Sequence, residues 1–269
     1  MSRRDFKGKA ILISGAAGGL GAALCHRFAA AGARIAAMDR DAGRLDALTT
    51  ALNKTGADVL ALPGDIADAD ACRIAVERTV ADFGGLDGLI NNAGISQRSL
   101  LRDTDPDVIR RVMEVNFFGA LYLTHAALPH ITARRGVISA ISSVAGYAPL
   151  IGRTGYAASK HALHGFFDSL RTEVEDAGVG VTLICPSFIS TGIGAAALTA
   201  SGPRITAGGE STPEDIAARI FDAMSEGRAL LLPDRTSRLA WWLSRLLPAT
   251  YARTMKRRVG AEFGFKEMT

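Results

Sequence analysis

A tyrosine and a lysine lie four positions apart in the stretch GYAASKHALHG, residues 155–165. In a helix, Tyr156 and Lys160 would lie one turn apart on the same face. A free phenol has a pKa near ~10 and is a poor base at neutral pH, but a neighbouring ammonium group favours the phenolate. The pair is therefore typical of an acid/base group whose pKa is lowered by a neighbouring cation. The alternative is that both residues simply lie on a solvent-exposed face of a helix.

A glycine-rich stretch, SGAAGGLGAAL, covers residues 14–24. Gly15, Gly19 and Gly21 have the spacing G-x-x-x-G-x-G, which allows a tight turn and a close approach of the main chain to a ligand. A helix predicted from about Leu20 would direct its free N–H groups and the positive end of its dipole at this loop. The pattern predicts a pyrophosphate site, with a plain turn as the alternative.

Asp39 follows Gly15 by 24 residues, near the distance at which an acidic residue reaches the ribose hydroxyls of an adenosine. A carboxylate there would accept hydrogen bonds from those hydroxyls and repel a 2′-phosphate, which favours NAD over NADP. The adjacent Arg40 keeps NADP open, because an arginine pairs well with a 2′-phosphate. In GDIAD, Asp65 could meet the adenine amino group and Ile66 its apolar face, although Asp65 could equally cap a helix.

Short apolar runs alternate with longer amphipathic ones along the chain. The runs predict strands over Ala10–Ser14, Arg34–Met38, Asp58–Leu62, Gly88–Asn91, Gly136–Ser142, Gly180–Cys185 and Ala229–Leu232. The amphipathic segments predict helices over Leu20–Ala31, Asp41–Thr50, Ala69–Phe83, Pro106–His130, Tyr156–Ala177 and Pro213–Ser225. Continuous apolar strands are typical of a parallel sheet buried on both faces.

The predicted fold is a doubly wound α/β (Rossmann) architecture with a parallel sheet of about seven strands and helices on both faces. Ligands of such sheets bind outside the carboxyl ends of the strands. We expect residues 1–235 to form one NAD(P)-binding domain that includes the catalytic site and a substrate lid at about 188–210. Residues 236–269 would form a basic amphipathic extension of the same domain.

Composition narrows the class of protein. The 269 residues are 48% hydrophobic and 22% charged, and no apolar run reaches the ~18–20 residues that span a bilayer. Residues 219–269 hold ten Lys/Arg and five Asp/Glu, whereas the preceding body is close to neutral, which argues against a nucleic-acid partner. No His or Cys has metal-ligand spacing, so no metal is expected. Three scattered cysteines without an export signal predict reduced thiols and a cytoplasmic location.

Six motifs carry a resemblance to a known family. SGAAGGLG, GDIAD, NNAG, ISSVAG, YAASK and CPSFIST occur in the order and approximate spacing of the short-chain dehydrogenase/reductase superfamily, over about residues 7–235. The resemblance implies that Tyr156 is the acid/base group and that Lys160 lowers its pKa and holds the nicotinamide ribose. It also implies that Ser143 stabilises the substrate oxygen and that Asn116 holds a proton-relaying water.

The same resemblance extends the set of residues expected to bind the cofactor. That set is Ser14, Gly15, Gly19, Leu20, Gly21, Asp39, Arg40, Asp65, Ile66, Asn92, Ala93, Gly94, Tyr156, Lys160, Pro186, Ile189 and Thr191. One departure is Ser187, which stands where the family usually has glycine. Ser187 must therefore adopt its backbone angles without the freedom of glycine, or the loop must differ.

The substrate pocket is expected to be apolar. Its predicted wall residues are Val144, Tyr147, Leu150, Phe188, Ile193 and Leu198. They favour a lipophilic secondary alcohol or ketone, and steroid, retinoid, aromatic and fatty substrates all remain open. NADP-dependent carbonyl reduction and a non-catalytic nucleotide-binding scaffold are the alternatives, and the presence of Ser143, Tyr156 and Lys160 favours an enzyme. The family resemblance also implies a homodimer or homotetramer.

The C-terminal segment has a pattern of its own. Leu239, Trp242, Leu243 and Leu246 recur at helical spacing between arginines, and Pro248 should end that helix. An apolar stripe with tryptophan and flanking cations is typical of a helix lying at a membrane surface. The alternative is that the stripe packs on the body or against another subunit.

Overall fold

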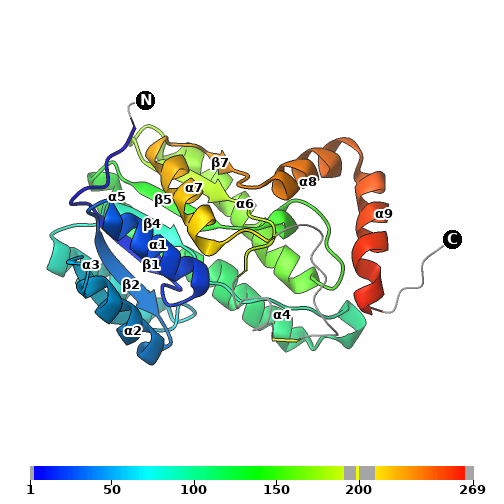
Figure 1. The fold of residues 1–269 in the computed structure, drawn as a ribbon, viewed down its shortest axis with the longest axis horizontal. Coiled ribbons are helices and arrows are strands. Elements are labelled where there is room, and N and C mark those ends of the chain that lie inside the picture. The colour runs from blue at the N-terminus through cyan, green and yellow to red at the C-terminus, as the bar shows by residue number, and fades with distance from the viewer. Residues whose placement is uncertain (1–2, 191–197, 200–209, 264–269) are drawn as a thin grey trace.

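The computed structural model describes residues 3–190, 198–199 and 210–263, without the side chains of residues 261 and 262. Its centre is one seven-stranded sheet in which every neighbouring pair of strands is parallel, in the order β3-β2-β1-β4-β5-β6-β7 (Figure 1). The predicted doubly wound α/β fold is confirmed.

The strands are short and the helices between them longer. The strands are β1 (Ala10–Ser14), β2 (Arg34–Asp39), β3 (Val59–Pro63), β4 (Gly88–Asn91), β5 (Val137–Ile141), β6 (Gly180–Ile184) and β7 (Leu230–Leu231). The α-helices are α1 (Gly19–Ala30), α2 (Ala42–Asn53), α3 (Ala69–Phe83), α4 (Pro106–Met113), α5 (Gly119–Ala133), α6 (Thr154–Val174), α7 (Pro213–Ser225), α8 (Arg235–Leu246) and α9 (Pro248–Val259).

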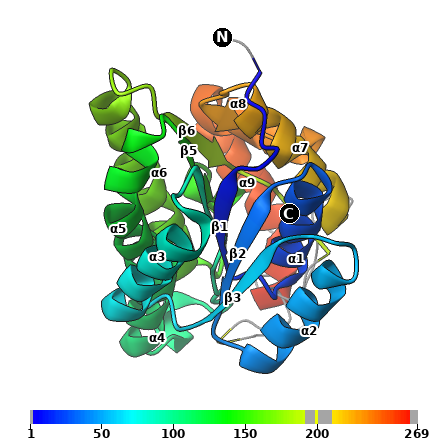
Figure 2. The same cartoon turned by 90° about the vertical axis from the view of Figure 1, so that its left-hand side faces the viewer.

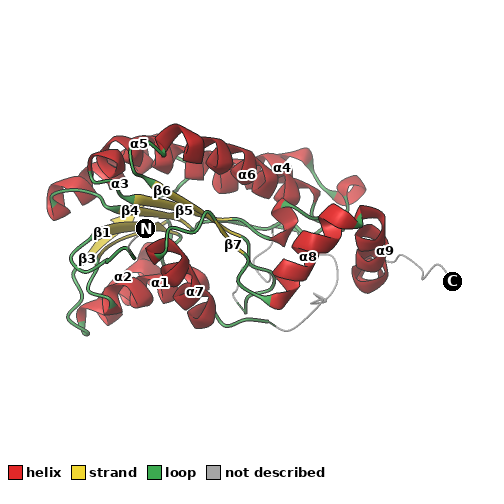
Figure 3. Cartoon of the chain, turned by 90° about the horizontal axis from the view of Figure 1, so that it is seen from above, coloured by secondary structure: helices red, strands yellow, loops and turns green. Residues whose placement is uncertain are grey.

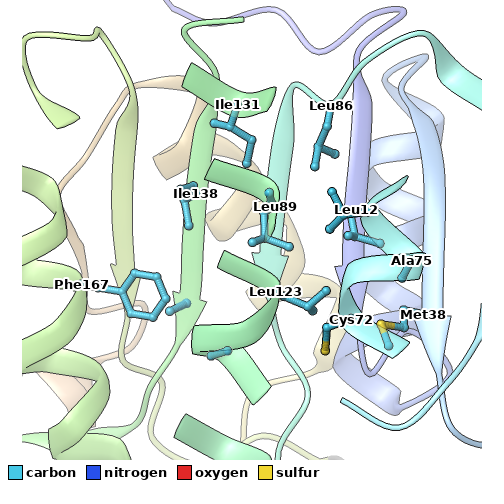
Figure 4. Packing of buried hydrophobic residues seen from close by; sticks show 14 of the residues in the cluster. Leu12, Met38, Cys72, Ala75, Leu86, Leu89, Leu123, Ile131, Ile138 and Phe167 are labelled. Atoms are coloured by element: carbon cyan, nitrogen blue, oxygen red, sulfur yellow. The ribbon is translucent and has the colours of Figure 1, made fainter. Parts of the chain in front are cut away.

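Helices cover both faces of the sheet (Figures 2 and 3). Successive side chains of a strand point to opposite faces, so Leu12 of β1 joins the core under α3, α5 and α6, whereas Ile11 and Ile13 join the core under α1, α2 and α7. Figure 4 shows the first of these cores, in which Leu12 and Leu89 of the sheet lie near Leu123 of α5. Burial on both faces explains why the strands are continuously apolar.

The strand order reverses between β1 and β4. The chain proceeds outward from β1 to β2 and β3 on one side, then returns to β4 and proceeds outward on the other. The loops that leave β1 and β4 therefore diverge at the carboxyl edge of the sheet, which opens a crevice there.

The segment predicted as one helix, Pro106–His130, is instead three consecutive pieces. Between α4 and α5 the turn Glu114–Phe118 is a π-helix, and α5 continues past Pro129 to Ala133. Hydrophobic periodicity cannot detect a π-turn, because one inserted residue shifts the pattern only locally. Helix α6 ends at Val174, three residues before the predicted end.

Helices α8 and α9 stand beyond the end of the sheet (Figure 1). Their small core consists of Ala240, Tyr251 and Ala148, with Leu243 and Met255 packed against it. Asp234 caps α8 through a reciprocal pair of hydrogen bonds with Ser237. None of the helices in the described residues combines the length and hydropathy needed to cross a membrane.

Candidate active site

A cavity of about 510 Å³ lies at the carboxyl edge of the sheet. Its walls come from the loops that follow β1 to β6 and from the inner sides of α8 and α9. All predicted cofactor-binding residues line it except Thr191, which lies outside the described residues. The sheet thus brings together side chains that are up to 175 positions apart, from Ser14 to Ile189.

The glycine loop is built so that only glycine fits at two positions. Gly15 has a φ of +62°, and a Cβ there would lie 2.8 Å from the Cα of Ala93. A Cβ on Gly21 would lie against the carbonyl oxygen of Gly15. Helix α1 begins at Gly19, and its N-cap Gly18 offers no side-chain cap, so its first N–H groups have no side-chain acceptor at the cap. This cradle fits a pyrophosphate.

Ser14 and Asn92 join the loop after β1 to the loop after β4. The hydroxyl oxygen of Ser14 accepts hydrogen bonds from the backbone N–H groups of Asn92 and Ala93, both at 3.1 Å. The side-chain amide of Asn92 donates to the carbonyl oxygens of Ser14 (2.9 Å) and Gly15 (3.0 Å). These four bonds hold the two loops together at the carboxyl ends of β1 and β4. The side-chain amide of the preceding Asn91 donates to Thr124 of α5 at 3.0 Å.

Asp39, at the end of β2, holds the glycine loop in place. One carboxylate oxygen accepts from the backbone N–H of Ala17 at 2.9 Å, and the other accepts from that of Asp41 at 3.0 Å. Arg44 of α2 donates to the carbonyl oxygen of the same Ala17 at 2.9 Å. Asp39, Arg40 and Arg44 all line the cavity, so a carboxylate and two cations border the end expected to take the adenine ribose.

Asp65 is also held by two partners. It accepts from the backbone N–H of Ala67 at 3.0 Å and from the guanidinium of Arg111 on α4 at 2.8 Å. Desolvation opposes ionisation, but the Ala67 hydrogen bond and the Arg111 cation together lower the pKa of Asp65. The carboxylate is therefore charged at neutral pH, and it lies beside Ile66 in the cavity wall.

Tyr156 and Lys160 lie in the first two turns of α6 and line the same cavity. The Lys160 ammonium lies 5.7 Å from the centroid of the Tyr156 ring. It is buried and donates to the carbonyl oxygen of Ile141 at 2.7 Å. Burial lowers the pKa of Lys160 to about 8. The lysine is thus still a cation at neutral pH, as a group that stabilises a phenolate must be.

Two serines follow β5 and have different surroundings. Ser143 lines the cavity and its hydroxyl accepts from the backbone N–H of Ala145 at 3.2 Å, which leaves the hydroxyl proton available for another acceptor. Ser142 is buried, donates to the carbonyl oxygen of Lys160 at 3.3 Å, and lies 3.0 Å from Nε2 of His164. Burial lowers the pKa of His164 to about 4. The sequence did not predict that Ser142 and His164 would form this pair next to the backbone of Lys160.

Asn116 lies in the π-helical turn, behind the cavity rather than in its lining. Its side chain exchanges two hydrogen bonds with the backbone of Ile95, at 2.8 and 3.0 Å, and donates to Ser159 at 2.9 Å. A Cβ placed on Gly94 would lie 3.3 Å from Asn116 Oδ1 and 3.6 Å from Lys160 Nζ, so the two side chains face the same glycine. The π-turn thereby places a polar side chain on the same side of Gly94 as Lys160.

The loop after β6 accommodates Ser187 at the position where the family usually has glycine. Among the described residues only Arg135 combines a side chain with a positive φ, so Ser187 needs no glycine-like angles. It lines the cavity between Pro186 and Phe188. Its backbone N–H and its hydroxyl both donate to Asp234, at 3.0 and 2.8 Å.

The predicted substrate-pocket residues divide into three groups. Val144, Leu150, Phe188 and Leu198 line the cavity, and Ile193 lies outside the described residues. The expectation for Tyr147 is wrong: it is not in the described lining, its hydroxyl donates to the carbonyl oxygen of Ser237, and its ring packs against Trp241. Tyr147 is thus packed against α8, and its burial there raises the pKa of its phenol far above the usual range.

Helices α8 and α9 supply a part of the wall whose residues were not among the predicted pocket residues. The described residues of these two helices in the lining are Thr236, Leu239, Ala240, Leu243, Tyr251, Thr254, Met255 and Arg258. Their apolar members recur at helical spacing, which was visible in the sequence, but nothing in that spacing says which body the helices cover. Among the described residues no three His, Cys, Asp or Glu side chains could together hold a metal ion.

A family model described as short chain dehydrogenase matches residues 9–201. Curated relatives match nearly the whole chain. The dehydrogenase/reductase SDR family protein 7-like of Anopheles gambiae is 39% identical, with 95% of this chain and 84% of the relative covered. Dehydrogenase/reductase SDR family member 7B of Rattus norvegicus is 38% identical, with 97% and 84% covered.

A solved structure agrees with the fold. A short chain dehydrogenase/reductase from Burkholderia phymatum, in complex with NAD, superposes with a TM-score of 0.83 at 26% sequence identity. The match covers 90% of this chain and 94% of the other.

Proposed function

The chain belongs to the short-chain dehydrogenase/reductase family of oxidoreductases, and from that premise we propose that it transfers a hydride between NAD(H) and a lipophilic secondary alcohol or ketone. One observation carries the proposal: a single cavity is lined by the glycine loop, by Ser143, Tyr156 and Lys160, and by apolar side chains. The residues proposed to bind the nucleotide and those proposed to transfer the proton therefore line the same cavity.

The residues present fit NAD. The glycine cradle would hold the pyrophosphate, Asp39 would accept hydrogen bonds from the adenine ribose, and Ile66 would lie against the adenine. Pro186 and Ile189 would lie at the nicotinamide end. When bound, NAD(H) supplies the hydride acceptor or donor. The NAD complex of the Burkholderia phymatum protein supports the choice of cofactor.

The chain's own residues would move the proton. Tyr156 would take the hydroxyl proton of an alcohol as phenolate, or return it to a ketone oxygen as phenol. Lys160, as a cation 5.7 Å from the ring, would favour the phenolate. Ser143 would donate a hydrogen bond to the substrate oxygen, which bears the developing negative charge.

A lipophilic substrate is supported by the apolar side chains of the cavity wall. Leu150, Phe188, Leu198, Leu243 and Met255 line it. Burial of apolar surface contributes roughly 25 cal/mol per Å², so these side chains would select substrates by their apolar area.

NADP is the second candidate for the cofactor, and Arg40 and Arg44 favour it. Both line the cavity beside Asp39, and an arginine recognises a 2′-phosphate well. The Asp39 carboxylate opposes the same phosphate. Because Arg44 already bonds to Ala17, we favour NAD.

We also infer a cytoplasmic homodimer or homotetramer. The three cysteines are free and buried, in keeping with reduced thiols. Phe117, Phe118 and Tyr122, together with Phe166 of α6, form a partly exposed aromatic group that would suit a contact between subunits. Sedimentation velocity tests the oligomeric state.

The function is tested with a panel of lipophilic secondary alcohols and ketones, assayed with NAD(H) and NADP(H) through the absorbance of the reduced nicotinamide. We expect turnover with at least one apolar secondary alcohol and little with small polar ones. Tight nucleotide binding without turnover of any member would favour a non-catalytic scaffold.

A further inference from the structure

The outward face of α8 exposes an unusual amount of apolar surface. Seven large apolar side chains are exposed in the described part of the chain, and four of them, Leu239, Trp242, Leu246 and Leu247, lie within nine residues. Their exposed fractions are 59%, 60%, 70% and 53%. A concentration of this kind marks an interaction site rather than ordinary surface.

The rotation of α8 is fixed by its inner side. Ser237 and Ala240 are buried, and the Trp241 ring packs edge-on against Tyr147 with centroids 4.9 Å apart. The Arg245 guanidinium lies 3.1 Å from the centroid of the Trp241 ring. With this side held, Leu239, Trp242 and Leu246, at positions i, i+3 and i+7, must share the opposite face. Of the stripe predicted from sequence, Leu243 packs on the small core, whereas Leu239, Trp242 and Leu246 remain more than half exposed within one chain.

The two helices that carry this apolar face are rich in cations and contain no carboxylate. Residues 235–259, which span α8 and α9, contain seven Lys/Arg and no Asp or Glu. All seven cations are exposed, and Arg235 and Arg238 lie on the same face of α8 as Leu239 and Trp242. We define the docking face as Arg235, Arg238, Leu239, Trp242, Leu246 and Leu247.

We propose that this docking face binds an anionic lipid surface. Tryptophan and leucine would enter the boundary between headgroups and acyl chains, and the arginines would pair with lipid phosphates and carboxylates. A second copy of the chain is the other occupant to consider. In a two-fold contact the same cations would face each other with no carboxylate of this segment to neutralise them, whereas an anionic membrane supplies that charge.

The docking face adjoins the rim of the cavity. Leu239 belongs to both, since it lines the cavity and is 59% exposed, and Leu198 of the rim is 47% exposed. A substrate dissolved in the lipid would therefore reach the cavity over apolar side chains. This last step rests on the proposed function, but the docking itself does not.

The test is co-sedimentation of the full-length protein with vesicles of phosphatidylcholine alone or of an equal mixture with phosphatidylserine, at about 0.05 M and about 0.5 M salt. We expect binding to the anionic vesicles only, lost at the higher salt, with a blue shift of tryptophan fluorescence. Arg235→Gln/Arg238→Gln should lower the partition coefficient roughly 30-fold, and Trp242→Ser/Leu246→Ser by at least about 10-fold. None of these four residues lines the cavity.

Matched controls come from exposed residues elsewhere. Ile74→Ser/Leu101→Ser removes two exposed apolar side chains, and Arg73→Gln/Arg78→Gln removes two exposed cations of α3. Both control variants should bind vesicles as the wild type does. The proposal is overturned if the wild type does not bind anionic vesicles, or if all four variants bind equally. It is also overturned if Trp242→Ser/Leu246→Ser lowers the oligomeric state, because the face is then a contact between copies. Activity in detergent-free buffer, measured separately, reports on the function and not on docking.

Discussion

Ser187 donates two hydrogen bonds to Asp234, one from its backbone N–H at 3.0 Å and one from its hydroxyl at 2.8 Å. Ser187 lies in the loop that closes the cavity after β6, and Asp234 is the N-cap of α8. The pair therefore joins the expected nicotinamide end of the cavity to the helix that supplies its apolar wall. Both residues are half-buried at this junction.

Asp234→Ala should disturb the apolar wall and leave the nucleotide site intact. It removes the N-cap of α8 and both Ser187 bonds, so we expect a loss of about 1–2 kcal/mol of stability and a raised KM for lipophilic substrates with an unchanged Kd for NAD. The measurements are thermal melts, steady-state kinetics and nucleotide titration. Asp68→Ala, which removes the N-cap of α3 and does not change a residue of the cavity lining, is the matched control and should lower stability without raising that KM.

Asp39→Asn should narrow the preference for NAD over NADP. The amide oxygen can still accept the Ala17 hydrogen bond that holds the glycine loop, but the charge that repels a 2′-phosphate is gone. We expect kcat/KM for NAD to fall and that for NADP to rise. Asp41→Asn, the next carboxylate along the chain, should leave the ratio unchanged. A wild-type enzyme with the higher kcat/KM for NADP would mean that Arg40 and Arg44 outweigh Asp39.

Lys160→Met should move the pH profile of alcohol oxidation as well as slow it. Without the ammonium near the Tyr156 ring, the phenolate would form only near the ordinary pKa of ~10. The rising limb of kcat/KM against pH should therefore shift upward, with turnover at neutral pH reduced at least ~10²-fold. An unshifted limb in a folded variant would remove Lys160 from the role of tuning the tyrosine.

His164 should make the fold sensitive to mild acid. Its pKa is about 4 in the folded protein, because burial disfavours the charged ring, and 6.5 is its ordinary value. Between pH 4 and pH 6.5 the unfolded chain therefore binds a proton at His164 that the folded protein does not bind. The stability that the neutral, buried ring allows is complete above pH 6.5 and is lost as the pH falls toward 4. The loss should not exceed about 3.4 kcal/mol, the equivalent of that difference in pKa.

The measurement is thermal unfolding of the wild type and of His164→Gln between pH 4 and pH 7. The variant should show a flatter dependence of stability on pH. His161→Gln changes an exposed histidine of the same helix and should keep the slope of the wild type. Equal slopes in all three proteins would show that His164 does not titrate as its burial requires.

The inner part of the site could be predicted from sequence because its residues follow strands. Asp39, Asn92 and Ser143 each come directly after a buried apolar run, and the carboxyl ends of parallel strands meet at one edge. The family resemblance, which the comparisons confirm, added the pairing with Tyr156 and Lys160 on a helix.

The outer part could not be predicted because it depends on tertiary packing. The sequence showed an amphipathic C-terminal segment, but tertiary contacts such as Tyr147–Trp241 and the burial of Ala240 determine which side of α8 faces the body. Tyr147 was misplaced for the same reason, since its position after Ser143 suggested a pocket wall. The π-turn that holds Asn116 leaves too short a mark on hydrophobic periodicity to be seen.

The turnover of Tyr156→Phe tests the central claim most directly. The substitution removes one hydroxyl from the cavity and keeps the ring beside Lys160, so NAD binding, measured by titration of the nucleotide, should be nearly unchanged. Turnover of the best substrate of the panel should fall by a factor of at least ~10² if Tyr156 transfers the proton. A folded variant that binds NAD and retains a tenth or more of wild-type turnover would contradict the account.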